Sequence, residues 1–516
     1  MGDLSRPTRA TWAPTRATWA LIAAVIGSSM SFIDGTAVNV ALPIIQHDLH
    51  ASAAAGQWVI ESYALFLSAL ILIGGSLGDL YGRKRIYGIG IAIFALASIV
   101  CALAPSIGWL VAGRSLQGLG GALATPGSLA LISVNFSGEA RGRAIGTWSG
   151  ASAVTAAFGP VLGGTLAQLG AWRWVFVINI PLAALVLAIL VLRVDESRDG
   201  SASRRVDVWG ATLATVGLGA LVYGLIAVGS GAFAAPSLAA IVIGIFALVG
   251  FVVLEARASQ PMIPLAFFRV RRFALANAYT LFVYAALGGS LFFVPFDLIN
   301  VQHYPPSLAG AALLPMIVIL VIFSPASGGL VARIGARTPL AAGASIVACG
   351  FVLFARASSG GSYWTTFFPA AIVLGLGLSA LVAPLTTTVM DALEPANAGI
   401  ASGINNAVSR AAGLLAIAVL GIVLAATFSA TFDRRLARTH VSAATSETLA
   451  HERATIVAGR VPAGIASASD RRIVSDAITV AYGDGFRTVM LVSALLALLS
   501  VPIALDSSFR QIAPSR

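Results

Sequence analysis

Charged side chains are scarce in this chain of 516 residues. Only 10% of the residues are charged, whereas soluble domains usually carry about 25%. Hydrophobic residues make up 58% of the chain. So little charge cannot cover the surface of a water-soluble protein of this length, and the composition therefore predicts a polytopic membrane protein.

Lysine and cysteine are also nearly absent. Lys84 is the only lysine, and it follows Arg83 where a Walker A loop requires glycine, so the chain lacks that phosphate-binding site for ATP. Cys101 and Cys349 both lie inside apolar runs, where packing is the usual role of a thiol. Neither a disulfide framework nor a cysteine metal site is predicted.

The sequence favours no enzymatic chemistry. Its five histidines lie near or in the predicted outer connections, without a His-Glu-x-x-His spacing. We therefore expect no enzyme, no metal and no cofactor. The net charge of +11 comes from basic residues scattered between apolar runs, a distribution that indicates membrane topology and anionic lipid instead of nucleic acid.

Fourteen apolar runs are each long enough for a bilayer crossing of ~20 residues. They lie near 18–42, 58–77, 86–104, 109–134, 144–167, 173–192, 208–228, 237–254, 274–298, 308–331, 339–356, 364–385, 399–428 and 486–505. Arginines gather in alternate short connections, and the opposite ones hold almost none apart from Arg173 and Arg356. The positive-inside rule then predicts both termini in the cytoplasm and a location in the cytoplasmic (inner) membrane.

One connection, 429–485, is long, and the predicted topology places it outside. Its arginines do not contradict that placement, because long segments cross largely regardless of charge. Stretches such as 465–482 could form amphipathic surface helices, and disorder is an equal alternative.

An internal repeat divides the chain. Residues 75–85, between the second and third runs, are echoed by residues 328–338, between the tenth and eleventh. The simplest partition is a tail (1–17), a six-helix bundle (18–193), a linker with two extra spans (194–273), a second six-helix bundle (274–505) and a tail (506–516). Repeated halves predict a site at their interface.

Asp34 is the clearest functional candidate within the spans. A carboxylate at mid-bilayer costs a few kcal/mol and normally faces a bundle interior or a wet cavity. Desolvation disfavours its charged form, which suits reversible proton uptake. The alternative is a structural hydrogen bond to a neighbouring helix.

Two further acidic residues each allow two positions in the predicted fold. Glu61 either faces the same cavity or sits at the outer interface, while for Asp297 an interfacial position is favoured over a buried one.

Arg114 needs a carboxylate or carbonyl partner, and a fixed cation there could control proton release from Asp34. Gln117 lies on the same helix face and Gly118 permits close packing. Arg410 is similar in the second half, where we expect a structural clamp.

Two glycine-rich segments complete the motifs. The loop from Gly78 to Arg85 contains Asp79, Gly82, Arg83 and Lys84, which predict a tight cytoplasmic hairpin with a lone carboxylate at a helix end. The fifth run carries Gly146, Gly150, Gly159, Pro160, Gly163 and Gly164. Proline and glycine predict a kinked, tightly packed helix there that acts as a hinge or seal.

Together these motifs resemble the major facilitator superfamily and, within it, the fourteen-span drug:H+ antiporter branch. The loop 78–85 resembles its cytoplasmic signature; Arg114, Gln117 and Gly118 resemble the fourth-span motif linked to proton transfer. Gly150, Gly159, Pro160, Gly163 and Gly164 resemble the fifth-span motif of exporters. Asp34, Asn39 and Pro43 match the first-span motif, and residues 172–181 are similarly typical. The chain departs from the family pattern at two positions. In the second copy of the loop motif, Ala332 stands where the first copy has Asp79, and Asp297 stands where the branch has an apolar or aromatic residue.

The resemblance implies an all-helical fold of two six-helix bundles plus two extra central helices. It implies efflux of lipophilic drugs or toxic compounds, cationic ones among them, by alternating access against protons, with Asp34, Arg114 and Glu61 in proton coupling. A lipid, siderophore or metabolite exporter is the alternative, and only the fifth-span motif weighs against an importer. Candidate pocket residues are Phe32, Asn39, Trp58, Tyr63, Phe158, Tyr284, Phe292, Phe293 and Asp297. We expect a monomer whose partners are a small hydrophobic substrate, protons and lipid.

Overall fold

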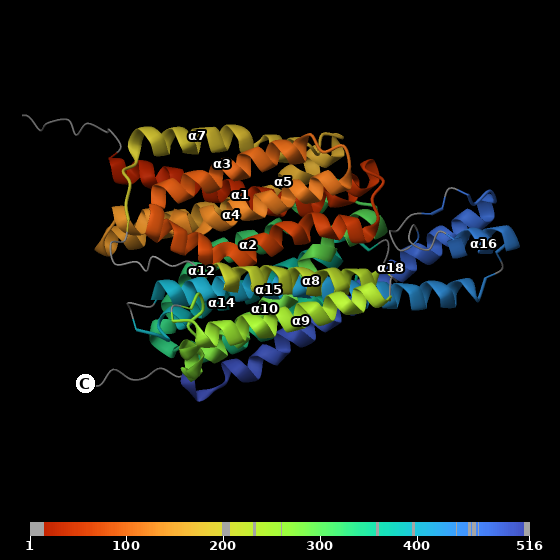
Figure 1. Cartoon of the computed structure of the whole chain (residues 1–516). Coiled ribbons are helices and arrows are strands. Elements are labelled where there is room, and N and C mark those ends of the chain that lie inside the picture. The colour runs from red at the N-terminus through yellow and green to blue at the C-terminus, as the bar shows by residue number, and fades with distance from the viewer. Residues whose placement is uncertain are drawn as a thin grey trace, which may run out of the picture.

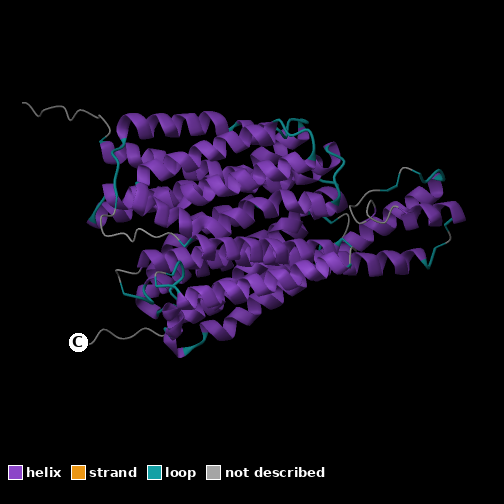
Figure 2. Cartoon of the chain, viewed as in Figure 1, coloured by secondary structure: helices purple, strands orange, loops and turns teal. Residues whose placement is uncertain are grey.

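The computed structural model of the chain describes most of its residues. The described residues are 15–198, 207–230, 234–259, 261–357, 361–394, 398–439, 441–451, 456, 461–462 and 464–509. They form helices joined by loops and turns, without a strand among them (Figure 2). The predicted tails 1–14 and 510–516 therefore lie outside the described residues.

The first half of the chain forms seven helices. They are α1 (Arg16–Asp48), α2 (Ala53–Tyr81), α3 (Arg83–Ala102), α4 (Ile107–Asn135), α5 (Gly138–Gln168), α6 (Trp174–Val177) and α7 (Asn179–Arg193). The short helix α6 and α7 together form the sixth predicted span. Two helices follow as the predicted insert, α8 (Val208–Gly229) and α9 (Ala235–Arg257).

The second half forms the remaining elements. They are η1 (Leu265–Arg269), α10 (Arg271–Phe296), η2 (Asp297–Val301), α11 (Pro306–Ala311), α12 (Leu314–Ile334), α13 (Arg337–Phe354), α14 (Tyr363–Met390), α15 (Ala398–Leu436), α16 (Ala443–His451), α18 (Ala468–Ala504) and η4 (Ser507–Phe509). Each of the fourteen predicted runs therefore falls on a helix.

Thirteen helices of the described residues are long and apolar enough to cross a membrane. The run 109–134, on α4, is not among them, although α4 has 29 residues. Its glycines, serines, Gln117 and Arg114 lower its apolar character, and it packs extensively between α2 and α3. Because α4 is shielded by its neighbours, it needs less apolar surface than a helix that faces lipid.

The two halves lie side by side as two bundles (Figure 1). In the first, α1 packs on α5 and α4 packs on α2 and α3; in the second, α13 packs on α14 and α10 on α15 and α18. The halves meet where α2 contacts α15 and where α5 contacts α11 and α12. Helix α8 packs against both α2 and α15, and α9 packs on α8, so the insert covers one side of the seam between the halves.

The two ends of the bundle differ along α5. We call the end that holds the Gly78–Arg85 loop the basic end and the opposite one the far end. At the far end a Cβ atom at Gly164 would overlap the backbone of Pro306, and Ser307 Oγ donates to Gln168 Oε1. Gly150 lies fourteen residues before Gly164, about four turns away on the same face, yet no atom of the described residues lies within 4 Å of its Cβ position. This face of α5 is closed at the far end and open at the basic end.

The long connection folds largely into helices that project beyond the bundle (Figure 1). Helix α15 continues to Leu436 and α18 begins at Ala468, eighteen residues before the predicted span 486–505. The Asp470 carboxylate accepts hydrogen bonds from Ser442 Oγ and Thr445 Oγ1, each at 2.7 Å. From residue 468 onward the connection is therefore helical and not disordered. The rings of Phe428, Phe432 and Tyr482 are buried between α15 and α18 and hold this part together.

Candidate functional site: a buried ion pair in the first half

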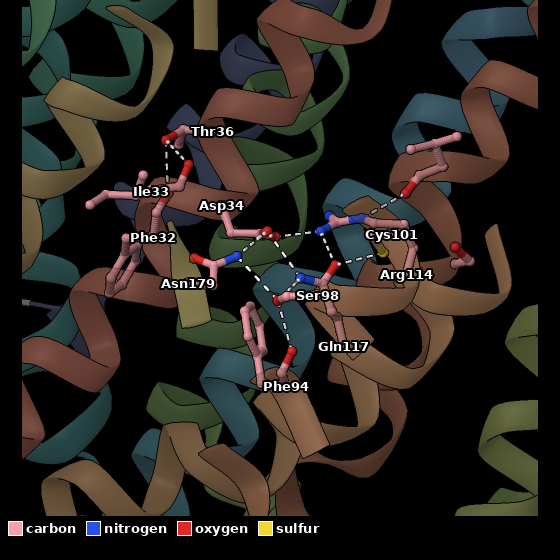
Figure 3. Close-up of polar contacts among 12 residues, drawn as sticks. Phe32, Ile33, Asp34, Thr36, Phe94, Ser98, Cys101, Arg114, Gln117 and Asn179 are labelled. Carbon is pink, nitrogen blue, oxygen red and sulfur yellow. Dashed lines mark hydrogen bonds and ion pairs between the residues drawn. The ribbon is translucent and has the colours of Figure 1, made fainter. Parts of the chain in front are cut away.

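Asp34 and Arg114 form an ion pair inside the first bundle (Figure 3). Asp34 lies in the middle of α1, and Arg114 lies on α4; both residues are fully shielded from solvent. Arg114 Nη1 donates to Asp34 Oδ2. The structure thus brings together the predicted proton acceptor and the predicted fixed cation.

Two amides complete the environment of the Asp34 carboxylate. Gln117 Nε2 and Asn179 Nδ2 both donate to Asp34 Oδ1, at 3.1 and 3.0 Å. With Arg114, three donors from α4 and α7 converge on one carboxylate. Guanidinium and amide N–H groups are the donors that the two oxygens of a carboxylate accept. A proton on either oxygen would have to displace one of these donors.

Arg114 has further partners of its own. Its Nε donates to the backbone oxygen of Val59 at 3.1 Å, and Nη1 also donates to Gln117 Oε1 at 2.9 Å. The guanidinium lies 4.3 Å from the ring centroid of Tyr63. These contacts hold Arg114 between α2 and α4 through groups other than Asp34, as expected of a cation that stays fixed while its partner changes charge.

A second layer of polar groups orients the amides. Ser98 Oγ accepts from Gln117 Nε2 at 2.8 Å and from Asn179 Nδ2 at 3.3 Å, and it donates to the Phe94 carbonyl at 2.8 Å. Cys101 Sγ contacts Gln117 Oε1 at 3.5 Å. Cys101 therefore belongs to the polar network as well as to the packed core, whereas Cys349, expected to pack, is exposed on α13.

Small residues let the helices of the network approach closely. A Cβ atom at Gly118 would lie 2.5 Å from the backbone oxygen of Tyr63, so only glycine allows α4 this close to α2. Gly163 has the same role between α5 and α1, where a Cβ atom would overlap the backbone of Ala37. Gly159 faces Ile33 and Thr36 one turn earlier. The fifth-span glycines therefore seat the helix that carries Asp34.

Sequence reasoning missed Asn179 and Ser98. Both are polar residues within otherwise apolar runs, and Asn179 lies inside the segment 172–181 that was noted for its family resemblance alone. Its place between Ile178 and Ile180, two residues before Pro181, was a usable signal, because an amide inside a membrane span needs a partner.

Glu61 is buried but does not join this network. It lies two residues before Tyr63 on α2, about 200° around the helix, and neither of its carboxylate oxygens has a hydrogen-bond partner among the described residues. It is fully shielded within the protein. Glu61 therefore does not share the hydrogen-bond network of Asp34 in this structure, and its role stays a prediction.

Asp297 is buried as well, which corrects the expectation of an interfacial position. It is 3% exposed and begins η2, a π-helical turn at the far end of α10. This turn packs against α18, and Gln302 Nε2 donates to Asp297 Oδ2 at 3.3 Å. The sequence pattern after Pro295 indicated where the helix changes but not that another helix covers it.

The Gly78–Arg85 loop is a tight joint between α2 and α3. Gly82 has a φ of +113°, a conformation that favours glycine. Asp79 pairs with Arg83 at 2.8 Å, so its carboxylate is not alone at the helix end. The backbone N–H groups of Lys84 and Arg85 each donate to Glu196 at 3.0 Å, and Glu196 thereby caps the first turn of α3 from the segment after α7.

The predicted pocket residues do not gather in one place. Phe292 and Phe293 line a pocket of about 270 Å³ at the far end, between α2, α8, α10 and α15, together with Gln57 and Tyr482. Phe158 is 63% exposed on α5. Among the other candidates, Tyr63 contacts Arg114 and Trp58 packs near Tyr223 of α8. The Oδ1 atom of Asn39 has no partner among the described residues. Phe32 and Tyr284 are half-buried.

In the part of the chain that the structure describes, no cluster of three or more His, Cys, Asp or Glu could hold a metal ion.

Comparison with curated proteins finds exporters. Multidrug resistance protein Stp of Mycobacterium tuberculosis (strain CDC 1551 / Oshkosh) is 40% identical over 427 residues, which cover 81% of this chain and 78% of that protein. The tetracenomycin C resistance and export protein of Streptomyces glaucescens is 32% identical over 491 residues, which cover 94% of this chain and 90% of that protein.

Solved structures match the fold across the whole chain. A bacterial homolog of the human lysosomal transporter Spinster, in an inward-facing and unoccupied conformation, has a TM-score of 0.67 and 18% identity, with 96% of this chain and 98% of that chain covered. A sequence profile of the Major Facilitator Superfamily matches residues 24–417. The chain is a multi-pass membrane protein that belongs to the Major Facilitator Superfamily.

Proposed function

We propose that the protein exports drugs or other toxic small molecules across the cytoplasmic membrane in exchange for protons. The similarity to resistance and export proteins supports the cargo class. The observation that carries the proton coupling is the Asp34 carboxylate, which is buried among three donors and can lose its charge only by taking up a proton. Both termini lie in the cytoplasm in this proposal, as the arginine distribution predicts.

Protonation of Asp34 and its pairing with Arg114 exclude one another. A neutral carboxyl group gains a donor of its own and loses most of its attraction for the guanidinium. The contacts of Arg114 to Val59 and Tyr63 keep the cation in place when Asp34 is neutral. One proton therefore changes how tightly α1 is held to α4.

The change at α1 passes to the seam between the halves through α5. Gly159 and Gly163 seat α5 on α1, and the adjoining face of α5 closes the far end through Gly164 and Pro306. A shift of α1 moves α5 as a unit, which opens the far end while the face at Gly150 closes at the basic end. The two halves thus rock around a central site and give alternating access.

The energy of one proton is sufficient for useful export. An elementary charge that moves inward contributes about 2.3 kcal/mol per 100 mV, and each unit of pH difference contributes about 1.4 kcal/mol. Since about 1.4 kcal/mol corresponds to a factor of ten, one proton per cycle sustains at least a tenfold gradient of a neutral compound.

The proposal is tested by efflux assays in a host that lacks its own exporters. Cells that make the protein are loaded with lipophilic cations, neutral drugs and lipid-like compounds at several external pH values, with and without a protonophore. We expect efflux of at least one drug class that the protonophore stops. Efflux confined to the lipid-like compounds would replace the cargo assignment, and drug efflux that persists with the protonophore would refute proton coupling.

A further inference from the structure

Arg410 is a cation without a partner at the centre of the molecule. It lies within α15, its Nε is buried without a hydrogen-bond partner, and no carboxylate of the described residues forms an ion pair with it. An arginine inside a membrane protein is costly unless something compensates its charge. The expectation of a structural clamp fails here because a clamp needs groups to hold.

Arg410 faces the seam between the two halves. On α15, Gly403 lies against Leu72 of α2, and Gly421 lies against Gln57 of the same helix. Arg410 is seven residues after Gly403 and eleven before Gly421, which is about two and three helical turns and places all three on one face. The guanidinium therefore projects toward α2, between the two points where the halves touch.

Two tyrosines surround this position. Arg410 lies within electrostatic range of the hydroxyl groups of Tyr63 on α2 and Tyr284 on α10. Tyr63 is also within range of Asp34 and Arg114, and its ring lies against the Arg114 guanidinium. Arg410 thus lies on the other side of the seam from the proton-coupling pair.

The backbone around Arg410 is held firmly. Helices α10 and α15 cross closely at Gly288 and Gly413, where a Cβ atom on Gly288 would lie 2.6 Å from the Gly413 Cα. Asn405 donates to Asn277 and Thr280 of α10 at 3.2 and 2.7 Å. These contacts on both sides of Arg410 fix α15 against α10, so the guanidinium is positioned without using its own hydrogen bonds.

The neighbouring acids do not compensate this charge. Asp34 is committed to Arg114, Gln117 and Asn179. Glu61 forms neither a hydrogen bond nor an ion pair with Arg410 among the described residues. The seam therefore holds a guanidinium that none of the described residues pairs, and a guanidinium matches a carboxylate.

We propose that Arg410 binds a carboxylate group of the exported molecule at the seam between the two halves. This inference rests on the proposed export function and assigns its cargo to amphiphilic acids, with an apolar body for the half-buried aromatic surface and one carboxylate for the cation.

Export of an anion against a proton has a distinct electrical signature. Outward movement of one negative charge and inward movement of one proton both carry positive charge inward. With one proton per cycle, export of the acid should therefore depend twice as steeply on membrane potential as export of a neutral analogue.

A matched set of probes tests the assignment. Pyrenebutyrate, its neutral amide and the cationic pyrenebutylamine share one aromatic body and differ in charge. Their binding to the purified full-length protein is measured by fluorescence anisotropy, with the detergent alone as background. We expect the wild-type protein to bind the acid at least about tenfold more tightly than the amide, as a charge-assisted hydrogen bond provides, and the amine most weakly.

The variants Arg410→Gln and Arg410→Lys separate recognition from structure. Arg410→Gln should weaken binding of the acid about tenfold or more and leave the amide within about twofold, while Arg410→Lys should keep part of the preference. Arg438→Gln, an exposed position in the turn that follows α15, is the matched control and should change neither.

Two results would overturn the inference. One is equal binding of acid and amide by the wild-type protein, a comparison that needs no variant to fold. The other is an equal loss for all three probes in Arg410→Gln, which would make Arg410 a structural residue. If either occurs while protonophore-sensitive efflux of neutral drugs persists, the export function stands and only the cargo assignment fails.

Discussion

At the scale of single residues, the buried Asp34–Arg114 pair is expensive to hold and expensive to break. Taking both charges out of water costs several kcal/mol per ion, which good geometry and extra hydrogen bonds offset. Removing one partner of such a pair typically costs about 3–5 kcal/mol. If the pair served stability alone, apolar residues could replace it at little cost. The chemistry of the Asp34–Arg114 pair therefore matters more than its contribution to folding.

Replacement of the carboxylate should separate transport from folding. Asp34→Asn keeps the shape of the side chain and the contacts of Arg114 to Val59 and Tyr63, so the protein should still fold, with a lower melting temperature. Proton-coupled efflux should be lost because the amide cannot take up a proton. The exposed Asp476→Asn on α18 serves as the control, and vigorous efflux by Asp34→Asn would remove Asp34 from the mechanism.

Asn179 should tune the pH at which the transporter works. Asn179→Leu removes one of the three donors that favour the charged form of Asp34. A hydrogen bond to a charged group contributes about 1.5–3 kcal/mol, so loss of this donor should weaken the network that holds the Asp34 carboxylate. The pH profile of efflux should therefore move toward alkaline values. An unchanged profile with a reduced maximum rate would indicate that Asn179 only packs.

Sequence reasoning reached Asp34, Arg114 and Gln117 because each is a polar residue in an apolar run and two lie one helical turn apart. It did not reach the partners, because which helix faces which is set by tertiary packing. Asn179 of α7 and Ser98 of α3 meet Asp34 of α1 only once the bundle forms. Glu61 was also predicted from its polarity within an apolar run. In the structure its oxygens have no hydrogen-bond partner among the described residues, and it does not join the network of Asp34.

At the scale of helices, α5 carries two kinds of glycine. Gly163 lies on the backbone of Ala37, whereas Gly146 and Gly150 have open space where a side chain would project. The sequence alone shows only a helix rich in glycine and proline. The structure divides the motif into a part that seats α5 on α1 and a part that has no neighbour in this conformation.

The two parts should respond differently to substitution. Gly163→Ala forces α5 away from α1 and should cost about 1–3 kcal/mol, the usual range for overpacking, seen as a lower melting temperature. Gly150→Ala should leave the melting temperature unchanged or slightly raised, since alanine favours helix over glycine by about 1 kcal/mol. Equal effects at the two positions would contradict the division.

A larger side chain at Gly150 should stop transport without unfolding the protein. If the halves rock, the face of α5 at Gly150 must approach the second half when the basic end closes. Gly150→Trp should therefore hold the protein in the present conformation, with normal thermal stability and lost efflux. Distances between spin labels at the basic end should stay long in this variant and vary in the wild-type protein. Normal efflux by Gly150→Trp would exclude closure along this face.

At the scale of the whole molecule, hydropathy and the repeat of residues 75–85 at 328–338 are enough to predict two bundles and a two-helix insert. The spans follow from length and composition, which local sequence carries. The helical projection of α15, α16 and α18 does not, because its rings pack only when the two ends of a long connection meet. The conformation, closed at the far end and open at the basic end, is likewise a property of the assembled halves.

Export as proposed requires that a proton on Asp34 is exchanged for cargo in every cycle. Purified protein is reconstituted into vesicles that contain a pH-sensitive dye, and an outward gradient of a drug shown to be a substrate in the efflux assay is imposed at zero membrane potential. We predict movement of protons against the drug in wild-type vesicles and none in Asp34→Asn vesicles. Drug movement in wild-type vesicles without any proton movement would contradict the account.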